Sequence, residues 1–521
     1  MSCNAGVCTP TDKNANLNAT DLATMLAASD VKIVTGAGSY SIEISAPLTW
    51  AGDGRLTLDA NQSIRFRAQV EVEGMGAVTL ITNDGGTGGQ LQFLGGNLAF
   101  WDHGRNLTIN GRTYKLIGTL SELKKHAAVH PGRAYALANS YDASVDGTYA
   151  HSPVPTTFNG FFEGLGNPIS NLAINDTTGG ENAGLFASVG ASGVIHGVVL
   201  VGASVHGAGP GAGGIVASNQ GLITNASISG AVGGGANTST GGIAGQNDGT
   251  ILSSVSSAHT FGGSGAGNGG LAGSNAGTIQ YSSASGSGSG GGLVGNNLSS
   301  GLIEDSHATG SMSTSSGSIG GLASTNAGTV LRSYATGSLS AIFGQHTSVS
   351  GLLGGLVGYN TGTIAQSFAT GDASTNQDND AEIFGGGLVA LNQGTVTNSY
   401  ATGSVTCIDP EFGYSECGGL IGENDGTASA SYSTGHASGA FSTGGFIGEN
   451  EVKDSLSDCY WDITTSQTSQ GVGRGDSAGV TGLTTTQFQA GLPGGFDSAI
   501  WAENTGINGG LPYLLALPPK Q

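Results

Sequence analysis

The fold of this chain is decided by a phrase that it repeats. The phrase reads GGLVGYNTGTIAQSFATG at residues 354–371 and GGLVALNQGTVTNSYATG at residues 386–403. With the second glycine of each Gly-Gly pair as the origin, nine copies begin at positions 214, 242, 270, 292, 321, 355, 387, 419 and 445. Self-similarity at this period predicts a solenoid in which each copy is one structural unit.

An asparagine stands five residues after every origin. The nine asparagines are Asn219, Asn247, Asn275, Asn297, Asn326, Asn360, Asn392, Asn424 and Asn450. Several units continue with a Gly-Thr-Ile or Gly-Thr-Val step, as at 249–251, and then with a Ser-aromatic-Ala-Thr-Gly step, as at 333–337. The apolar runs between glycines are short, which suits strands and disfavours helices.

A single unit of this kind cannot bury its own apolar face, but stacked units can, with strands about 4.8 Å apart along a common axis. The chain is therefore predicted to be all-β and to form a parallel β-helix (β-solenoid) whose insertions lie at one corner. We expect the apolar residues after each Gly-Gly pair to point inward. We expect the nine asparagine amides to bond to one another at a turn, where asparagine also tolerates left-handed backbone.

The Ser-aromatic-Ala step predicts a second column. In a strand, Ser and Ala share one face and the aromatic residue takes the other. We place Ser and Ala inside, where only small groups fit. The aromatic residues then form an exposed ladder outside, made of Tyr334, Phe368, Tyr400 and Tyr432.

The repeats divide the chain into four predicted regions. Alternating apolar and polar residues predict further β-coils over residues 1–110, and residues 111–182 are expected to connect these coils to the solenoid through short helices. The repeat solenoid spans 183–458, and residues 459–521, where the repeat stops, form a cap.

Helices are expected only in short pieces. Helix-start signals follow Asn18 and begin at Thr119, a third helix is expected near residues 132–139, and residues 484–492 are long enough for one turn. The apolar stretch 509–517 is expected to cover the open end of the last coil, which a solenoid must protect.

The charge balance excludes two classes of partner. The formal net charge is −21, and between Arg133 and Lys453 the single basic residue is Arg332. Such a surface repels nucleic acid and anionic lipid. The sequence has no apolar run that could cross a membrane, and its first residues do not resemble a secretory signal. We therefore expect either a cytoplasmic protein or an interior slice or mature part of a larger one.

Five cysteines bear on the compartment. Cys3 with Cys8, and Cys407 with Cys417, form two close pairs that disulfides could close, which favours an oxidising compartment. Zinc is the alternative, although neither spacing is that of a zinc site. Cys459 has no evident partner and is expected to be buried and inert.

The repeat unit resembles the GLUG repeat of bacterial surface proteins. Residues 107–174 (LTINGRTYKLIGTLSEL to NPISNLAI) and the closing CYWDITTSQTSQGVG resemble the segments that flank such repeats in large filamentous-haemagglutinin-like adhesins. The resemblance implies a right-handed β-helix, export by an outer-membrane partner transporter as part of a larger precursor, and adhesion or display at the cell surface. The secretion domain that opens such proteins, with its NPNG-type motif, is not found here.

Few motifs in the chain suggest chemistry. Arg474, Gly475 and Asp476 spell a receptor-binding RGD, which we weigh against chance occurrence in a glycine-rich turn. Asp378, Asp380 and Glu382 could hold calcium, but their spacing is not that of an EF-hand. The P-loop, zinc-peptidase and serine-hydrolase motifs are absent from the sequence.

Polysaccharide-cleaving enzymes also use β-helices, so an enzyme is one alternative. A lyase needs basic residues, which the central solenoid lacks, and a glycosidase needs two facing carboxylates. Glu304 and Asp305 are adjacent and would point to opposite faces of a strand. A threonine column could also suggest ice or mineral binding, but the unit length is too irregular for a flat array.

The sequence therefore predicts a structural, adhesive β-solenoid outside a bacterial cell, with no cofactor and no catalytic residues. The expected partner is a receptor or glycan on a host cell, a matrix or a neighbouring cell. The leading alternative is a subunit that associates end to end into a fibre, because solenoid ends invite strand addition.

Overall fold

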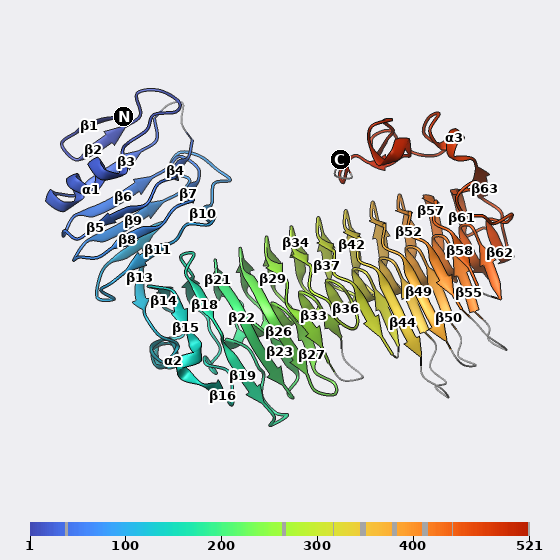
Figure 1. Ribbon diagram of the computed structural model, residues 1–521, viewed down its shortest axis with the longest axis horizontal. Helices are drawn as coiled ribbons and strands as arrows, with labels where there is room; N and C mark the ends of the chain where they lie inside the picture. The colour runs from blue at the N-terminus through green and yellow to red at the C-terminus, as the bar shows by residue number, and fades with distance from the viewer. Residues whose placement is uncertain are drawn as a thin grey trace. The chain divides into compact units, whose positions relative to one another are not determined.

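The computed structural model shows stacked parallel strands that form a β-solenoid of about 16 turns, with about 48% strand and 6% helix (Figure 1). The predicted fold class is therefore confirmed. The structure describes residues 1–36, 40–262, 267–315, 317–343, 351–377, 383–408, 415–439 and 441–518. The chain has two compact units: Met1–Ile174 with Leu185–Ser204 and Gly221–Ser227, and Asn175–Gly184 with Val205–Gln220 and Ile228–Gln521.

The first unit opens with coils of three strands each. Strands stack in parallel in three columns: β3 (Val31–Val34), β6 (Arg55–Asp59) and β9 (Ala77–Ile81); β4 (Ile42–Ile44), β7 (Ile64–Phe66) and β10 (Leu91–Phe93); β5 (Leu48–Trp50), β8 (Val70–Val72) and β11 (Leu98–Phe100). Alternate residues point inward, so that Leu56 and Leu58 are about 1% exposed while Thr57 between them is half-buried.

Helix α1 (Ala19–Ala28) packs against β3 and β5 of the first coil. It begins where the sequence predicts, because the Asn18 side chain accepts hydrogen bonds from the amides of Thr20 and Asp21. Leu22 and Leu26 are its buried residues. The first coil is thus covered by an amphipathic helix.

A β-hairpin ends this first group of coils. Strand β12 (Leu107–Ile109) pairs in parallel with β9 and antiparallel with β13 (Arg112–Ile117). Asn110 and Gly111, between the two strands, both have positive φ, as a tight two-residue hairpin turn requires. From β13 onward a new parallel column runs through β14 (Ala134–Leu137), β17 (Phe161–Glu163), β21 (Val194–His196) and β25 (Leu222–Thr224).

Helix α2 (Leu120–Val129) begins after its predicted N-cap, Thr119, whose side chain accepts from the Glu122 amide. The helix expected near residues 132–139 is wrong. Residues Ala134–Leu137 form strand β14, all four buried, which pairs with β13 on one side and β17 on the other. Pairing on both edges outweighs the helix propensity of its alanines and leucine.

The second unit contains the repeats, and its asparagine column is continuous. Each of the nine asparagines is the last residue of a strand, and these strands pair in parallel with every asparagine opposite the next. The strands are β24 (Val216–Asn219), β28 (Ala244–Asn247), β33 (Ala272–Asn275), β36 (Val294–Asn297), β41 (Ala323–Asn326), β46 (Val357–Asn360), β51 (Val389–Asn392), β56 (Ile421–Asn424) and β60 (Ile447–Asn450).

The amides of this column form one chain of hydrogen bonds. The Nδ2 atom of each asparagine donates to the Oδ1 atom of the next at 2.7–2.8 Å, from Asn219 through to Asn450. All nine side chains are at most 1% exposed. The asparagines lie in extended backbone at strand ends, so the expectation that this column exploits left-handed backbone is wrong.

The left-handed residue of each unit follows a second column of strands. These strands carry the Thr-Ile or Thr-Val step and include β42 (Thr329–Leu331), β47 (Thr363–Ala365) and β52 (Thr395–Thr397), whose central residues are fully buried. The next residue has φ of 45–51° in seven successive units: Ser253, Tyr281, Asp305, Arg332, Gln366, Asn398 and Ala430. None is glycine, although left-handed backbone costs other residues about 1–2 kcal/mol.

A column of serines lies just beyond this corner. The amide of each serine donates to the Oγ atom of the serine one coil further, from Ser254 to Ser431, at 3.1–3.2 Å. These serines and the alanine or serine two residues later are buried, as predicted for the inward face. The column satisfies backbone groups that the corner leaves without a strand partner.

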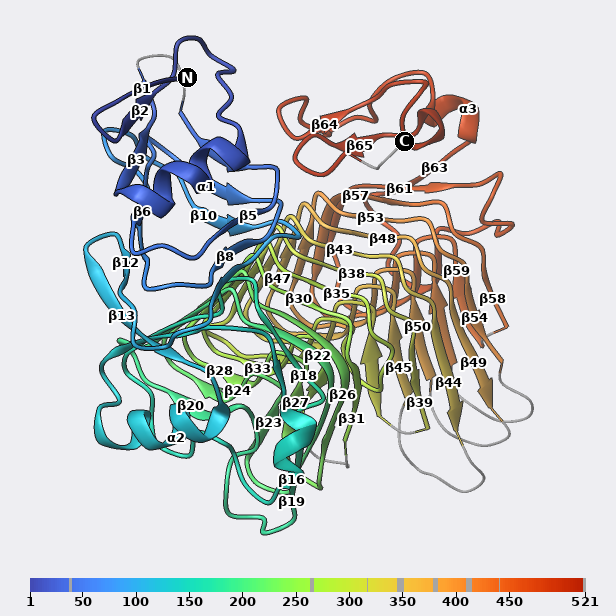
Figure 2. The same cartoon turned by 60° about the vertical axis from the view of Figure 1, so that its left-hand side comes forward.

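The aromatic residues form the predicted outer ladder. Its strands include β38 (His307–Ala308), β43 (Tyr334–Ala335), β48 (Phe368–Ala369) and β53 (Tyr400–Ala401), which follow one another in Figure 2. The ring centroids from His307 to Tyr432 are 4.7–5.0 Å apart, with planes within 12° of parallel. The expectation that the ladder is exposed is wrong for three of its four predicted residues, since Phe368 is 5% exposed and Tyr400 and Tyr432 are 0% exposed, while Tyr334 is half-buried.

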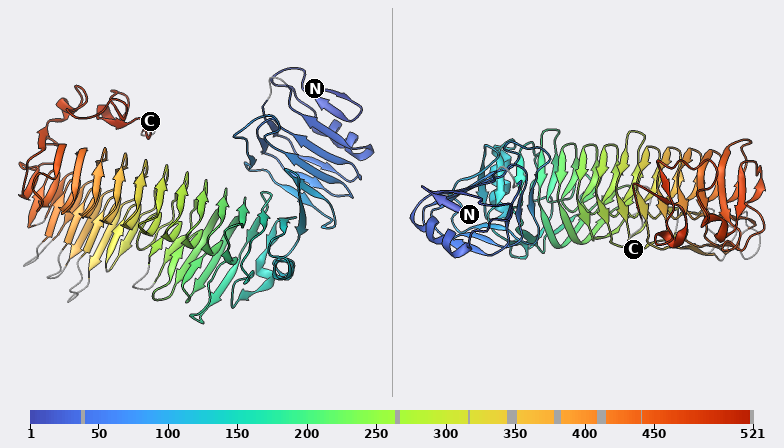
Figure 3. Two further views of the ribbon diagram at one scale, coloured as in Figure 1. Left: turned by 180° about the vertical axis from the view of Figure 1, so that it is seen from behind. Right: turned by 90° about the horizontal axis from the view of Figure 1, so that it is seen from above.

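The C-terminal segment covers the end of the ladder at Tyr432. Helix α3 (Thr485–Phe488), the predicted single turn, leads into a stretch that returns along the side of the coils (Figures 1 and 3). The Tyr432 hydroxyl donates to the Pro512 carbonyl, and Trp501 Nε1 donates to Asn398 Oδ1 at 3.1 Å. Leu514 is buried against the rings. Residues 509–517 therefore cover the side of the stack, not its end.

A tryptophan fills the interior near the last coil instead. In β61 (Leu456–Asp462), Trp461 takes the register position that the buried Ser433 holds one coil earlier. A Cβ atom at Gly445 or Gly471 would lie within 2.5 Å of the Trp461 ring. The glycines thus leave the space that the indole occupies.

Most differences in unit length lie at one corner, as predicted, although two further residues also separate Asn297 from the next strand. Strands β44 (Leu339–Phe343), β49 (Ala373–Gln377) and β54 (Val405–Cys407) form one column, and β45 (Gly351–Gly354), β50 (Ile383–Gly386) and β55 (Ser415–Gly418) form the next. The connections between the two columns are where the units differ. A disulfide from Cys407 to Cys417 joins β54 to β55 within a buried apolar cluster.

Replacing a left-handed residue with glycine should stabilise the repeats. Gln366→Gly relieves the left-handed penalty but adds backbone entropy to the unfolded chain, so we expect the free energy of unfolding to rise by about 0.5–1 kcal/mol. Ala365→Gly, one residue earlier in a strand, should lower it by about as much. Chemical denaturation of both variants measures whether the free energy of unfolding rises or falls in each. A loss of stability in Gln366→Gly would contradict the assignment of left-handed backbone at this position.

Removing one ladder amide should destabilise the solenoid. Asn360→Ala removes, in a fully buried site, the side chain that accepts a hydrogen bond from Asn326 and donates one to Asn392. We expect the free energy of unfolding to fall by about 1–3 kcal/mol. The matched control is Asn296→Ala, an asparagine on the half-buried outward face of the same strand column. Denaturant unfolding should show a clearly smaller loss for the control, and equal losses would argue against the ladder.

Candidate functional site

The strongest candidate site lies in the first unit, on the column of β17, β21 and β25. Glu163 pairs in register with His196, and His196 pairs with Thr224 one coil further. Because the strands are parallel and in register, side chains at these positions stack on one face of the sheet. Asn225, directly after β25, completes the group. We call Glu163, His196 and Asn225 the polar triad.

Hydrogen bonds fix the triad. His196 Nδ1 lies 2.7 Å from Glu163 Oε2, and the other carboxylate oxygen accepts from the Leu165 amide at 3.2 Å. The Asn225 Nδ2 atom lies 3.0 Å from His196 Nε2. A carboxylate only accepts, so Nδ1 carries the proton toward Glu163, and the Asn225 amide donates to Nε2 when the ring is neutral.

The pair of Glu163 and His196 is largely buried. The side chains of Glu163 and His196 are 5% and 19% exposed. Burial alone lowers the pKa of His196, but the charge of Glu163 and its hydrogen bond raise that pKa by more, so the net pKa is raised above 6.5. Burial, followed by the nearby Glu163 charge, raises the pKa of Tyr114 to about 12, so this phenol is neutral at physiological pH.

Two cavities meet at the triad. One, of about 340 Å³, is lined by Tyr114, Phe161 and the triad. The other, of about 550 Å³, runs along Leu91–Asn97 and also reaches His196 and Asn225. Both lie in the size range of small-molecule sites. The geometry can bind a polar ligand. Any role of His196 as a base would first require displacing Asn225 from Nε2.

The sequence did not single out the triad. Glu163 and His196 lie before the nine marked repeats, Asn225 lies within the first of them, and no short motif joins the three. One signal was present: His196 follows Glu163 by 33 residues and precedes Thr224 by 28, and both separations are of coil length. If the repeat register is extended upstream of the first marked repeat, it predicts that these residues stack on neighbouring coils.

Arg332, the one basic residue of the central stretch, is bound to two carboxylates. Its Nε and Nη2 atoms lie 2.7 and 2.9 Å from the Asp305 oxygens, and Nη2 also donates to Glu304. The hydrogen bond to Asp305 is the first cause of the raised pKa of Arg332. The expectation that Glu304 and Asp305 point to opposite faces is wrong, because the left-handed backbone of Asp305 turns both carboxylates toward Arg332.

The RGD residues lie at the end of the asparagine ladder. Arg474 and Gly475 belong to strand β62 (Val472–Gly475), and Arg474 pairs with Glu449 at 3.3 Å. The Asp476 carboxylate accepts from the amides of Asp454 and Ala478, which lower its pKa. Asn450, the last ladder residue, donates to the Asp476 carbonyl. These contacts tie both charged RGD side chains to the solenoid.

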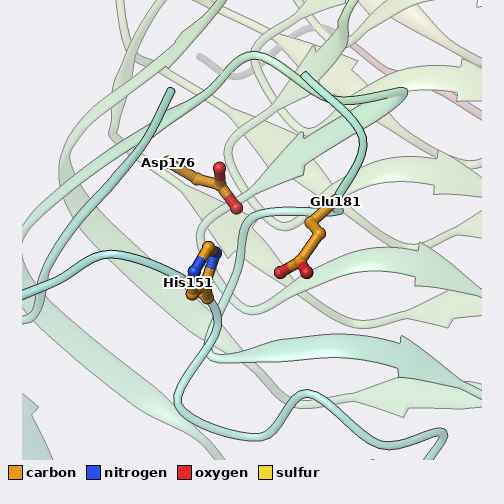
Figure 4. A group of neighbouring side chains, drawn as sticks. All are labelled: His151, Asp176 and Glu181. Carbon is orange, nitrogen blue, oxygen red and sulfur yellow. The ribbon is translucent and has the colours of Figure 1, made fainter. Parts of the chain in front are cut away.

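Two groups of three side chains in the described part of the chain have ligand geometry for a metal. One atom each of His151, Asp176 and Glu181 (Figure 4), and likewise of Glu423, Asp425 and Glu451, lie within 4.8 Å of one another. In the first group, Asp176 already accepts from the amide and hydroxyl of Thr178. The predicted calcium ligands Asp378, Asp380 and Glu382 lie outside the described residues.

The cysteines are arranged in two bridges and one thiol. Cys3 is bonded to Cys8 across the β-hairpin of β1 (Ser2–Asn4) and β2 (Val7–Thr9), and Cys407 is bonded to Cys417. Cys459 is buried and free, and burial raises the pKa of its thiol to about 12, so it is a poor nucleophile. Among the described residues, no helix has both the length and the apolar character needed to span a bilayer.

Comparisons with known proteins add little. No protein-family model and no curated protein matches the chain. One solved structure to which it is similar is titled IgA1 Protease, at 16% sequence identity and a TM-score of 0.24. The match covers 65% of this chain and 21% of that one, so the chain spans about a fifth of its length. A likeness this weak carries no argument about activity.

The triad predicts a specific dependence of stability on pH. Because the folded-state pKa of His196 is raised, its stabilisation is fully present below about pH 6.5 and is lost as pH rises through the folded pKa. We expect the stability difference between the parent and His196→Gln to shrink from about pH 5.5 to 8.5. Denaturant unfolding at several pH values measures the difference, and a difference that grows with pH would contradict the assignment.

Proposed function

We propose that the chain is a structural and adhesive β-solenoid of a bacterial surface protein of the GLUG-repeat, filamentous-haemagglutinin-like type. The observation that carries the proposal is the unbroken ladder of asparagine amides. Repetition here produces an extended, regular surface and a buried axial hydrogen-bond chain. That design suits attachment and display better than it suits a single reactive centre.

Three further observations support an extracellular setting and a non-catalytic role. Two disulfides favour an oxidising compartment. The net charge of −21 favours a solvated surface that does not bind nucleic acid. Arg332, the cation that a polysaccharide lyase would need in the central stretch, is held by Glu304 and Asp305.

End-to-end assembly is the alternative that the fold makes less favourable. Helix α1 covers the first coil, so that end offers fewer unpaired strand groups for addition of a second chain. Electron microscopy of the purified chain tests this alternative, since filaments longer than one molecule would favour the fibre.

The direct test is attachment. We expect surfaces coated with the purified chain to retain bacterial or host cells, or extracellular matrix, above a protein-coated blank. We also expect no hydrolase or lyase activity on a polysaccharide panel. The absence of attachment to any cell or matrix tested, or turnover of a polysaccharide, would overturn the proposal.

The RGD residues provide a second measurement in the same assay. Asp476→Glu keeps the charge but displaces the carboxylate that an RGD receptor would bind. Because Asp476 is already held by two backbone amides, we expect attachment of host cells to be unchanged by this substitution. A loss of attachment in a variant that folds normally would assign the receptor site to residues 474–476.

A further inference from the structure

We propose that the groove around His196 in the first unit is a binding site for a neutral oligosaccharide. The groove consists of the two cavities that share Leu91, His196 and Asn225. The inference rests on the proposed function, for which it names a ligand class and a place. The walls, the charge and the polar groups of the groove each support it.

One wall of the groove is an unpaired strand edge. Strand β10 is the last strand of its three-stranded sheet among the described residues. Gln90 O accepts from Ile64 N, and Leu94 N donates to Phe66 O, so these residues face β7. In a parallel ladder the alternate residues, Leu91 and Phe93, direct their N–H and C=O groups to the opposite edge, toward the groove. The edge offers donors and acceptors to a ligand.

The opposite wall has an apolar strip. Phe161, Val194 and Leu222 stack in register on β17, β21 and β25, and all three are half-buried. The Arg112 guanidinium lies over the Phe161 ring, with its carbon 3.4 Å from the centroid. Such a strip gives the C–H face of a sugar ring an apolar surface without enclosing it.

The charge of the groove selects an uncharged ligand. The Glu163 carboxylate is paired with His196 at 2.7 Å, so it is not available as an uncompensated charge. Tyr114, with its pKa near 12, is neutral. The other lining residues are uncharged. Arg112, over Phe161, is a cation beside the groove, but the net charge of −21 disfavours an anionic ligand, while a cation would meet no uncompensated carboxylate among the lining residues.

The remaining lining groups suit hydroxyls. Amide and hydroxyl side chains border the cavities at Thr82, Asn83, Gln90, Asn110 and Thr224. Amides both donate and accept, as sugar hydroxyls do. An extended peptide is the competing ligand, because it could pair with β10. The β10 edge is only three residues long, which favours the ligand that also uses the apolar strip and the amides.

The experiment tests whether a bulky side chain that occupies the groove prevents saccharide binding. Leu222→Trp places an indole on the apolar strip, and Leu302→Trp makes the same change at an equivalent half-buried strand position outside the groove, in β37 (Leu302–Glu304). The full-length parent and both variants are screened against an array of neutral oligosaccharides, and the hits are measured by calorimetry. Circular dichroism and denaturant unfolding confirm that both variants fold.

We expect the parent and Leu302→Trp to bind one or more neutral oligosaccharides, and Leu222→Trp to bind them roughly tenfold more weakly or not at all. Saccharide binding that Leu222→Trp leaves unchanged would overturn the inference. A folded parent that attaches to cells or matrix but binds no neutral saccharide would also overturn it while the proposed function stands. Binding of an extended-peptide library, lost in Leu222→Trp, would reassign the groove to a peptide. Failure of both attachment and saccharide binding would remove both proposals.

Discussion

In-register stacking of identical residues is the constraint on which this structure depends. Parallel strands place residue upon residue at the spacing of one hydrogen bond, so an amide side chain can bond to its own copy above and below. The nine asparagines use this geometry fully buried, where an unpaired amide would be costly. A shift of one residue in any unit would break two such bonds and turn the apolar side chains outward. The asparagines therefore specify the register as well as contribute to stability.

The corner of each unit, unlike the asparagine column, does not depend on stacking identical residues. The chain must turn sharply after the buried Ile or Val of the second strand column, and it does so with one left-handed residue that is never glycine in seven units. The serine beyond this corner bonds to the next serine along the axis, so the strained corner is bordered by regular columns on both sides. Strain of this kind persists where the surrounding structure determines it. The repeats thus tolerate varied residues such as Arg332 and Gln366 at this position.

The sequence was most informative where its period was visible. The nine origins predicted the parallel stack, the asparagine column and the inward serines. The N-caps Asn18 and Thr119 predicted two helices because capping is a local interaction. Three features depended on distant contacts and could not be read locally: strand β14, which pairs on both edges; the burial of Tyr400 and Tyr432 by the C-terminal segment; and the polar triad, whose members are one coil apart and share no motif.

The return of the C-terminal segment changes how the repeats can come apart. In a simple solenoid each coil contacts only its neighbours, so terminal coils can fray one at a time. Here the bond between Trp501 and Asn398 joins residues 103 positions apart, and Pro512 accepts from Tyr432 on another coil. Opening the last coils therefore also detaches the C-terminal segment and exposes several stacked aromatic rings at once. The final coils are thereby coupled into one cooperative block, which can close only after the whole C-terminal segment has been synthesised.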